Sequence, residues 1–183
     1  KEDKRFITGR GAFVQDVQLA NTKHIALVPS PYPRANIRSI DASAALAMDG
    51  VLDVITGAEL ADMCTGPWVG TLKVFENMKA EPQYPMAVDR ACWHGEPVVM
   101  VIAETRAQAE DAGEMVMVDY EELPVVIRKE KAIQPDSPVI HPNLGDNIAW
   151  EKVLGTGDVD KAFAEADHVL EETFEFGRHT AVS

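Results

Sequence analysis

The chain has 183 residues, of which 46% are apolar and 26% charged, so it can bury a core without a metal or a disulfide. Seventeen Lys and Arg stand against thirty Asp and Glu, which gives a formal net charge of −13. That balance argues against cationic contacts to nucleic acid phosphates and against docking on anionic lipid, so we expect neither partner.

The lengths of the apolar runs and the number of cysteines exclude further classes of protein. The longest uninterrupted apolar run, residues 98–103, is too short to cross a bilayer, and no secretory signal is visible. Cys64 and Cys92 form no CxxC pair, which argues against a zinc or iron–sulfur site in this chain. Two free thiols in a cytoplasmic protein are the favoured interpretation, with a disulfide left open. The sequence starts at Lys1 rather than Met, so we expect a piece of a larger protein.

The first third of the chain predicts short strands and two capped helices. Strands are expected over 12–14, 24–28, 36–40 and 51–55. Asp41 is expected to cap a short helix over 42–48. Thr56 and Glu59 match a capping box, whose hydroxyl and carboxylate satisfy free amides at a helix start, so a second helix is expected to run to about Cys64.

A long loop is predicted over 65–85, where three prolines and two glycines stand among polar residues. Loops of this length are uncommon unless they are functional or ordered by a partner. The loop carries Trp68 and Phe75, and exposed aromatic side chains often anchor interfaces. Both residues are therefore candidate partner contacts, although simple core filling by Trp68 is equally compatible with the sequence.

The clearest unit of the sequence lies over residues 97–120. The continuous apolar run 97–103 predicts a strand buried on both faces. Thr105 and Gln108 match a second capping box, and the helix that follows places three apolar residues on one side: Ala109, Ala112 and Val116. Residues 117–120 return as a strand, so this unit predicts a right-handed strand–helix–strand crossover.

The remainder of the chain predicts extended segments and one more helix. The prolines over 129–147 indicate an extended segment that runs over the protein surface. They also indicate that a domain ends there. Asp158 is expected to cap a helix with apolar residues at amphipathic spacing, and residues 168–176 alternate as a strand should. Together these elements predict an α/β (α+β) fold with a mixed β-sheet and packed helices.

No residue pattern in the chain points to an active site. The Gly-x-Gly turns at Gly9 and Gly155 do not extend to phosphate-binding motifs. The five histidines have no ligand spacing, and the carboxylates around Tyr120 fit a solvated strand end. We therefore assign no catalytic, cofactor-binding or metal-ligating residue from residue chemistry alone.

Ordered blocks of the sequence nevertheless resemble a known family. The blocks are residues 5–16, 30–41, 50–60, 95–112, 118–124 and 157–180. They are similar to the opening of the large subunits of molybdenum hydroxylases, which include xanthine dehydrogenase, aldehyde oxidase, carbon monoxide dehydrogenase and bacterial N-heterocycle hydroxylases. The sequence departs from the family at Pro29, Pro33 and Arg34, where Arg, Ala and His are usual.

The resemblance implies a fold and a non-catalytic role. Residues 1–135 would form an α/β hammerhead-like domain, and residues 136–183 a linker and the start of a molybdenum-cofactor-binding domain. The loop with Arg34 is a further candidate partner contact beside Trp68 and Phe75.

The resemblance also implies cofactors and partners outside this chain. This chain would hold none itself. The full-length protein would hold a molybdopterin, with iron–sulfur clusters and FAD in partner domains or subunits. Its partners would be the cofactor-bearing remainder of the large subunit and the iron–sulfur and flavin subunits. The whole enzyme would oxidise carbon monoxide, or hydroxylate an aldehyde or N-heterocycle with oxygen from water. The alternatives are a separately encoded short subunit and a free-standing binding module with the same fold.

Overall fold

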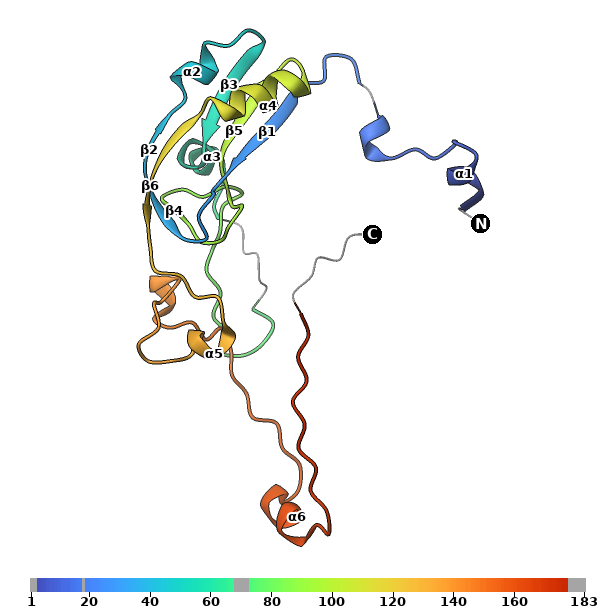
Figure 1. The fold of residues 1–183 in the computed structure, drawn as a ribbon, viewed down its shortest axis with the longest axis vertical. Helices are drawn as coiled ribbons and strands as arrows, with labels where there is room; N and C mark the ends of the chain where they lie inside the picture. The colour runs from blue at the N-terminus through green and yellow to red at the C-terminus, as the bar shows by residue number, and fades with distance from the viewer. Residues whose placement is uncertain (1–2, 18, 68–72, 178–183) are drawn as a thin grey trace. The chain divides into compact units, whose positions relative to one another are not determined.

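The computed structural model describes residues 3–17, 19–67 and 73–177, which divide into two compact units, Lys1–Trp150 and Glu151–Ser183 (Figure 1). The strands are β1 (His24–Pro29), β2 (Ala35–Asp41), β3 (Val51–Thr56), β4 (Arg90–Ala91), β5 (Pro97–Ala103) and β6 (Met117–Glu122). The α-helices are α1 (Asp3–Ile7), α2 (Ser43–Leu46), α3 (Gly57–Met63), α4 (Arg106–Glu114), α5 (Lys129–Ala132) and α6 (Val159–Glu165). Short 3-10 helices are η1 (Val14–Asp16) and η2 (Pro142–Leu144). Within the described ranges, no helix combines the length and apolarity needed to span a bilayer.

Two antiparallel three-stranded sheets form the first unit. One has the order β1-β5-β3 and the other β4-β2-β6. The expected α/β class is confirmed, but the expected mixed sheet is wrong, because each strand pair formed by the described residues is antiparallel. The expected crossover from β5 through α4 to β6 is also wrong, since β1 and β3 occupy both edges of β5 and β6 pairs with β2 instead.

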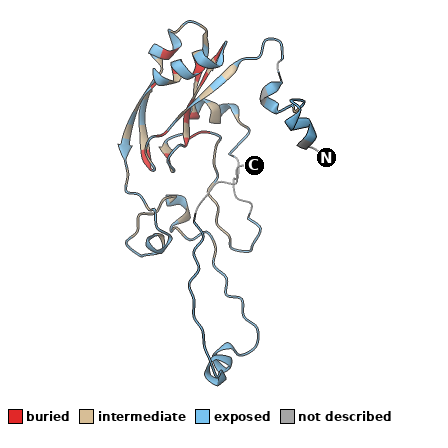
Figure 2. Ribbon diagram, turned by 45° about the vertical axis from the view of Figure 1, so that its right-hand side comes forward, coloured by how far each residue is buried: buried red, intermediate tan, exposed pale blue. Residues whose placement is uncertain are grey.

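The core lies where β5 packs against helix α4. Val101 of β5 is fully buried and pairs with Ala26 on one side and Val54 on the other. Ala109 and Ala112 bring the apolar side of α4 onto β1 and β5 and are also fully buried, as the sequence predicts. Figure 2 shows the buried residues gathered in the sheets and helices of this unit. The apolar run of β5 is therefore the centre of the hydrophobic core.

Local capping explains where the helices begin. The box predicted at Thr56 forms completely, because its hydroxyl accepts the Glu59 N–H while the Glu59 carboxylate accepts the Thr56 N–H. The box at Thr105 forms only in part: its hydroxyl accepts the Gln108 N–H, but the Gln108 side-chain amide donates to the Asp49 carbonyl. The sequence thus predicts which residue caps a helix, but it does not predict which hydrogen-bond partner a long polar side chain such as that of Gln108 takes.

Other local predictions are corrected by the structure. Residues 12–14 do not form a strand; the Asp16 carboxylate accepts the Phe13 N–H and turns the backbone into η1. The helix predicted after Asp41 forms as α2, with the Asp41 carboxylate accepting the Ser43 N–H, although the cap position itself is Ala42. The stretch 129–147, expected to be extended, contains α5 and η2.

The second unit contains a single helix within its described residues. Asp158 caps α6 as predicted, by accepting the Lys161 N–H at 3.0 Å. The strand predicted over 168–176 is wrong for this chain, since these residues pair with no strand in the described ranges. A strand needs a neighbour for its backbone hydrogen bonds, which an alternating pattern alone cannot supply.

Candidate contact site

Arg34 joins the start of β2 to the chain that follows β6. Its guanidinium donates to the carbonyl of Pro124 at 3.0 Å and to that of Val139 at 2.8 Å. The Arg34 carbonyl also accepts the Leu123 N–H at 3.0 Å. Only 8% of the residue is exposed, and burial, followed by the nearby charge of Arg90, lowers the pKa of Arg34 from its ordinary value. The structure gives Arg34 a role inside this chain, and its contact with a partner stays a prediction.

Phe75 lies against a residue that the sequence did not single out. Its ring stacks on Trp150, with centroids 4.2 Å apart and planes 16° apart. About half of Phe75, 49%, remains exposed. Trp68, the other aromatic residue predicted as a contact in this loop, lies outside the described residues. The stacked rings of Phe75 and Trp150 form a partly exposed apolar surface, and Trp150 is the last residue of the first unit.

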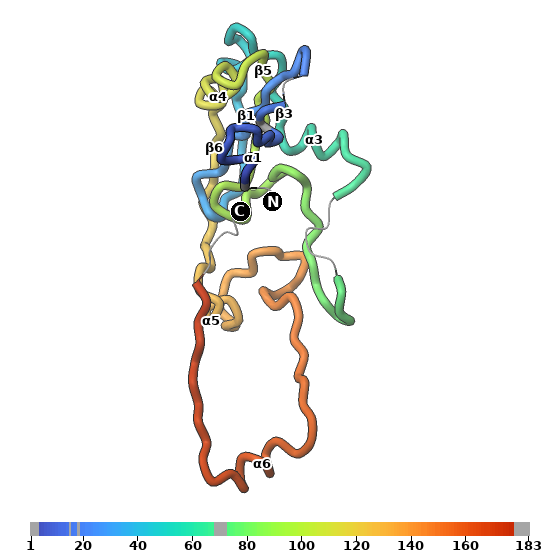
Figure 3. The backbone as a smooth tube through the Cα atoms, turned by 90° about the vertical axis from the view of Figure 1, so that its right-hand side faces the viewer, coloured from blue at the N-terminus to red at the C-terminus, as the bar shows by residue number. Residues whose placement is uncertain are grey.

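Polar contacts hold the Phe75 loop to the segment that ends at Trp150. Figure 3 traces the backbone of both segments, the loop in green and the later segment in orange. The Lys79 N–H donates to the Ala149 carbonyl at 2.7 Å, and the Lys79 ammonium contacts the Asp146 carboxylate at 2.7 Å. Asn143 donates to the Glu81 carboxylate at 2.9 Å. The Lys79 contact lowers the pKa of Asp146, which is solvent-exposed. This pairing was missed at the sequence level because its partners are more than sixty residues apart and share no local pattern.

A buried carboxyl closes the turn before β5. Glu96 is 7% exposed and its carboxylate accepts the backbone N–H of Cys92. Burial raises the pKa of Glu96, and burial together with the Glu96 charge raises the pKa of the Cys92 thiol. Cys64 and Cys92 are both free thiols, as expected. A protonated, half-buried Cys92 is therefore a weak nucleophile.

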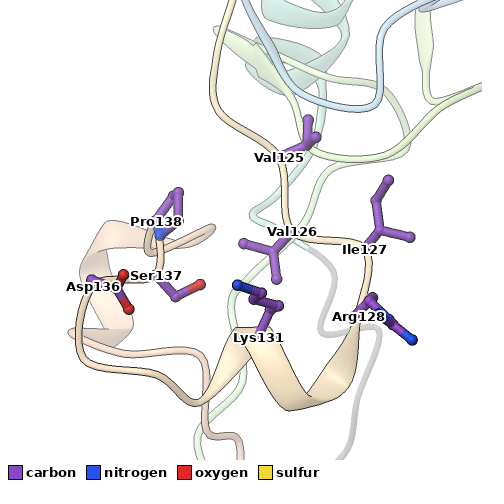
Figure 4. Close-up of a pocket in the computed structure, with 8 residues that line it drawn as sticks. All are labelled: Val125, Val126, Ile127, Arg128, Lys131, Asp136, Ser137 and Pro138. Atoms are coloured by element: carbon purple, nitrogen blue, oxygen red, sulfur yellow. The ribbon is translucent and has the colours of Figure 1, made fainter.

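Two of the hollows near these contacts differ clearly in size. The larger, about 450 Å³, lies between residues 81–93 and 141–143. The smaller, about 290 Å³, lies beside α5, where Val126, Lys131 and Ser137 face one another and Arg128 points away (Figure 4).

The larger hollow does not fit an anionic cofactor. Glu81, Asp89 and Glu96 line it, with Arg90 as the cation among its lining residues. The molybdopterin implied by the resemblance carries a phosphate, which three carboxylates would repel. Across the described ranges, no three His, Cys, Asp or Glu side chains are grouped to hold a metal ion.

Comparisons with known proteins show which proteins this chain is similar to. The family model of the aldehyde oxidase and xanthine dehydrogenase a/b hammerhead domain matches residues 8–124. The nicotine 6-hydroxylase large subunit of Paenarthrobacter nicotinovorans is 38% identical over 180 residues, which are 98% of this chain and 22% of that protein. The nicotinate dehydrogenase large molybdopterin subunit of Eubacterium barkeri is 32% identical over 95% of this chain and 38% of its own length.

A solved structure shares the fold. Quinoline 2-oxidoreductase from Pseudomonas putida 86 matches with a TM-score of 0.83 and 33% identity, over 92% of this chain and 21% of that chain. This chain thus spans about a fifth of both the nicotine 6-hydroxylase subunit and the quinoline 2-oxidoreductase chain.

Proposed function

Because this chain belongs to the aldehyde oxidase and xanthine dehydrogenase a/b hammerhead family, we propose that it is the non-catalytic hammerhead domain of a molybdenum hydroxylase large subunit. One observation carries the proposal: nearly the whole chain matches relatives, yet it accounts for only 22% of the nicotine 6-hydroxylase subunit. Its role is structural, and the reacting groups belong to the part of the subunit that this chain does not contain.

We propose the same domain organisation that the sequence suggests. The hammerhead domain occupies residues 1–135, and residues 136–183 lead into the cofactor-binding part. The compact first unit continues to Trp150 because the 141–150 segment is bound to the Phe75 loop. The loop with Trp68 and Phe75 is proposed to face a neighbouring domain or subunit.

We further propose that the full-length protein holds a molybdopterin and works with iron–sulfur and flavin partners in the cytoplasm. A relative named as a large molybdopterin subunit supports the first of these. The substrate is proposed only as a class: carbon monoxide, an aldehyde or an N-heterocycle, oxidised with oxygen from water. A separately encoded short subunit or free module is not favoured, since the relatives and the solved structure are all longer chains.

The mass of the native polypeptide tests this proposal. An antibody raised against residues 1–150 would be used on a denaturing gel of source-cell extract, and the captured protein analysed for molybdenum. We expect a band several times heavier than 20.0 kDa on the denaturing gel, and molybdenum in the protein captured under native conditions. A band near 20 kDa with no molybdenum in the captured material would contradict it.

A further inference from the structure

The larger hollow of the first unit has the size and the lining of a small-molecule site. Its volume of about 450 Å³ lies within the usual range for ligand pockets, roughly 300–1,000 Å³. The apolar part of its lining includes the buried Met86 and Ala87 and two aromatic residues, Tyr84 and Trp93. Trp93 is 44% exposed, so part of its surface remains free for a ligand. The hollow therefore offers apolar contact to an organic molecule.

The charges around the hollow favour a positive ligand. Glu81, Asp89 and Glu96 line it, and Arg90 is the cation among its lining residues. Arg90 is held toward β2, because its Nε donates to the side-chain oxygen of Asn36 at 3.0 Å, and Asn36 does not line the hollow. A positive group in the hollow is therefore attracted, whereas an anion is repelled.

Glu81 has hydrogen-bonding capacity that the rest of the chain leaves unused. One oxygen of its carboxylate accepts the side-chain amide of Asn143 at 2.9 Å. The other oxygen, Oε2, is shielded from water and finds no hydrogen-bond donor among the described residues. A shielded carboxylate oxygen without a donor is unfavourable, and a cation that binds beside it offsets that free energy. Glu81 thus indicates where the positive group of a ligand binds.

The lining favours an organic cation over a metal ion. Over the described part of the chain, no group of His, Cys, Asp and Glu side chains is arranged to hold a metal. Aromatic rings attract ammonium groups through their faces and also pack against apolar carbon atoms. A primary ammonium has three N–H donors, and the ionised carboxylates of Glu81 and Asp89 only accept hydrogen bonds. The two kinds of lining residue therefore match the two ends of an organic ammonium compound.

We propose that the larger hollow binds a small organic ammonium compound. The ammonium donates hydrogen bonds to the carboxylates of Glu81 and Asp89. The apolar body of the ligand lies against Tyr84, Met86 and Trp93. This binding site goes beyond the structural role proposed for the domain and does not depend on it, because all of its residues lie in the first unit of this chain.

Hydrogen exchange on the native full-length protein tests the proposal with two probes. Phenethylammonium carries the positive charge, and phenethyl alcohol is a neutral molecule of nearly the same shape. Saturating phenethylammonium should slow amide exchange of residues 81–93 and 141–143 at least about threefold, and the alcohol at the same concentration should leave it unchanged.

Three results of this experiment would overturn the proposal. Equal slowing by both probes would show that charge plays no part in binding. Unchanged exchange with both probes would show that the hollow binds neither. Slowing in chain 1–183 but not in the native full-length protein would show that a neighbouring part of the protein fills the hollow.

Substitutions that remove one charge each locate the ammonium. Glu81→Gln keeps an oxygen that accepts the Asn143 amide, and Asp89→Asn keeps a side chain of the same shape. Each should raise the phenethylammonium concentration for half-maximal slowing about fivefold. Glu114→Gln removes an exposed charge on α4, outside the hollow, and should leave that concentration unchanged. If Glu81→Gln and Glu114→Gln have equal effects while the amides of β5 stay protected, the proposal is wrong.

Discussion

Helices α3 and α6 have the same length and the same kind of start, yet their surroundings differ completely. Each has seven residues and a side-chain cap, Thr56 for α3 and Asp158 for α6. Helix α3 begins with the buried Gly57, which packs closely against the backbone of Ala87 before β4. Helix α6 buries none of its residues. Capping thus places a helix start in both regions, but only the first region supplies the packing that stabilises a helix.

The largest expected difference between the two regions comes from adding one methyl group to a glycine. A Cβ at Gly57 would lie 1.8 Å from the Ala87 carbonyl oxygen, so Gly57→Ala forces the backbone apart. We expect it to lower the free energy of unfolding by about 3 kcal/mol, measured by urea denaturation. Gly155→Ala, in the exposed residues 151–177, meets no atom within 4 Å and should change the free energy of unfolding by less than about 0.5 kcal/mol. Equal effects of the two substitutions would show that Gly155 is as closely packed as Gly57.

Arg34 offers the next test, because it separates a buried guanidinium from a surface one. Arg34→Ala leaves the carbonyls of Pro124 and Val139 without a donor and should cost about 2 kcal/mol in urea denaturation. Arg38→Ala, which removes an exposed pair with Glu121, should cost about 0.5 kcal/mol or less. If Arg34→Ala is as mild as Arg38→Ala, the carbonyl contacts contribute little and a partner contact becomes the better explanation for Arg34.

Removing the helix caps of α3 and α6 tests the same comparison with a smaller expected change in stability. Thr56→Ala removes the acceptor for the Glu59 N–H and should lower global stability of chain 1–183 by about 1 kcal/mol. Asp158→Ala removes an equivalent acceptor from α6, but it should leave the global unfolding transition unchanged, because every residue of α6 is exposed. A matching loss in both variants, followed by circular dichroism during denaturation, would place α6 inside the cooperative unit.

The smallest expected effect is a pH dependence that comes from Glu96. Burial raises the pKa of Glu96 in the folded chain, so the unfolded chain loses this proton first as the pH rises. The stability contributed by Glu96 is therefore fully present below its unfolded pKa, near pH 4, and falls as the pH rises toward its folded pKa. Wild type should lose stability relative to Glu96→Gln as the pH rises above about 4.

Glu59 provides the control of opposite sign. Hydrogen bonds from Thr56 lower the pKa of Glu59 in the folded chain, so its contribution is present above the unfolded pKa and is lost as the pH falls. Wild type should therefore gain stability relative to Glu59→Gln over the same rise in pH. The same sign for both variants in urea titrations would contradict the assigned causes.

Features that depend on neighbouring residues were predictable from the sequence. The caps at Thr56, Thr105 and Asp158 need only a side chain and an amide three positions away, and all three form. The apolar run 97–103 is long enough to require a fully buried strand, and β5 is the centre of the core.

Features that depend on distant pairing were not predictable from local patterns. The partner of β6 is β2 rather than β5, a choice fixed by which sheet edges remain free. The stacking of Phe75 on Trp150 joins two loops with no shared pattern. The strand predicted over 168–176 fails for a different reason: its pattern is correct for a strand, but the described chain offers it no neighbour.

Residue-resolved hydrogen exchange on chain 1–183 tests most directly whether the packed core of the first unit and the exposed residues 151–177 differ in stability. The account predicts that amides of β5 exchange only through global unfolding, while amides of 159–177 exchange at rates close to those of an unfolded peptide. Comparable protection of β5 and of residues 159–177 in a monomeric chain 1–183 would contradict it.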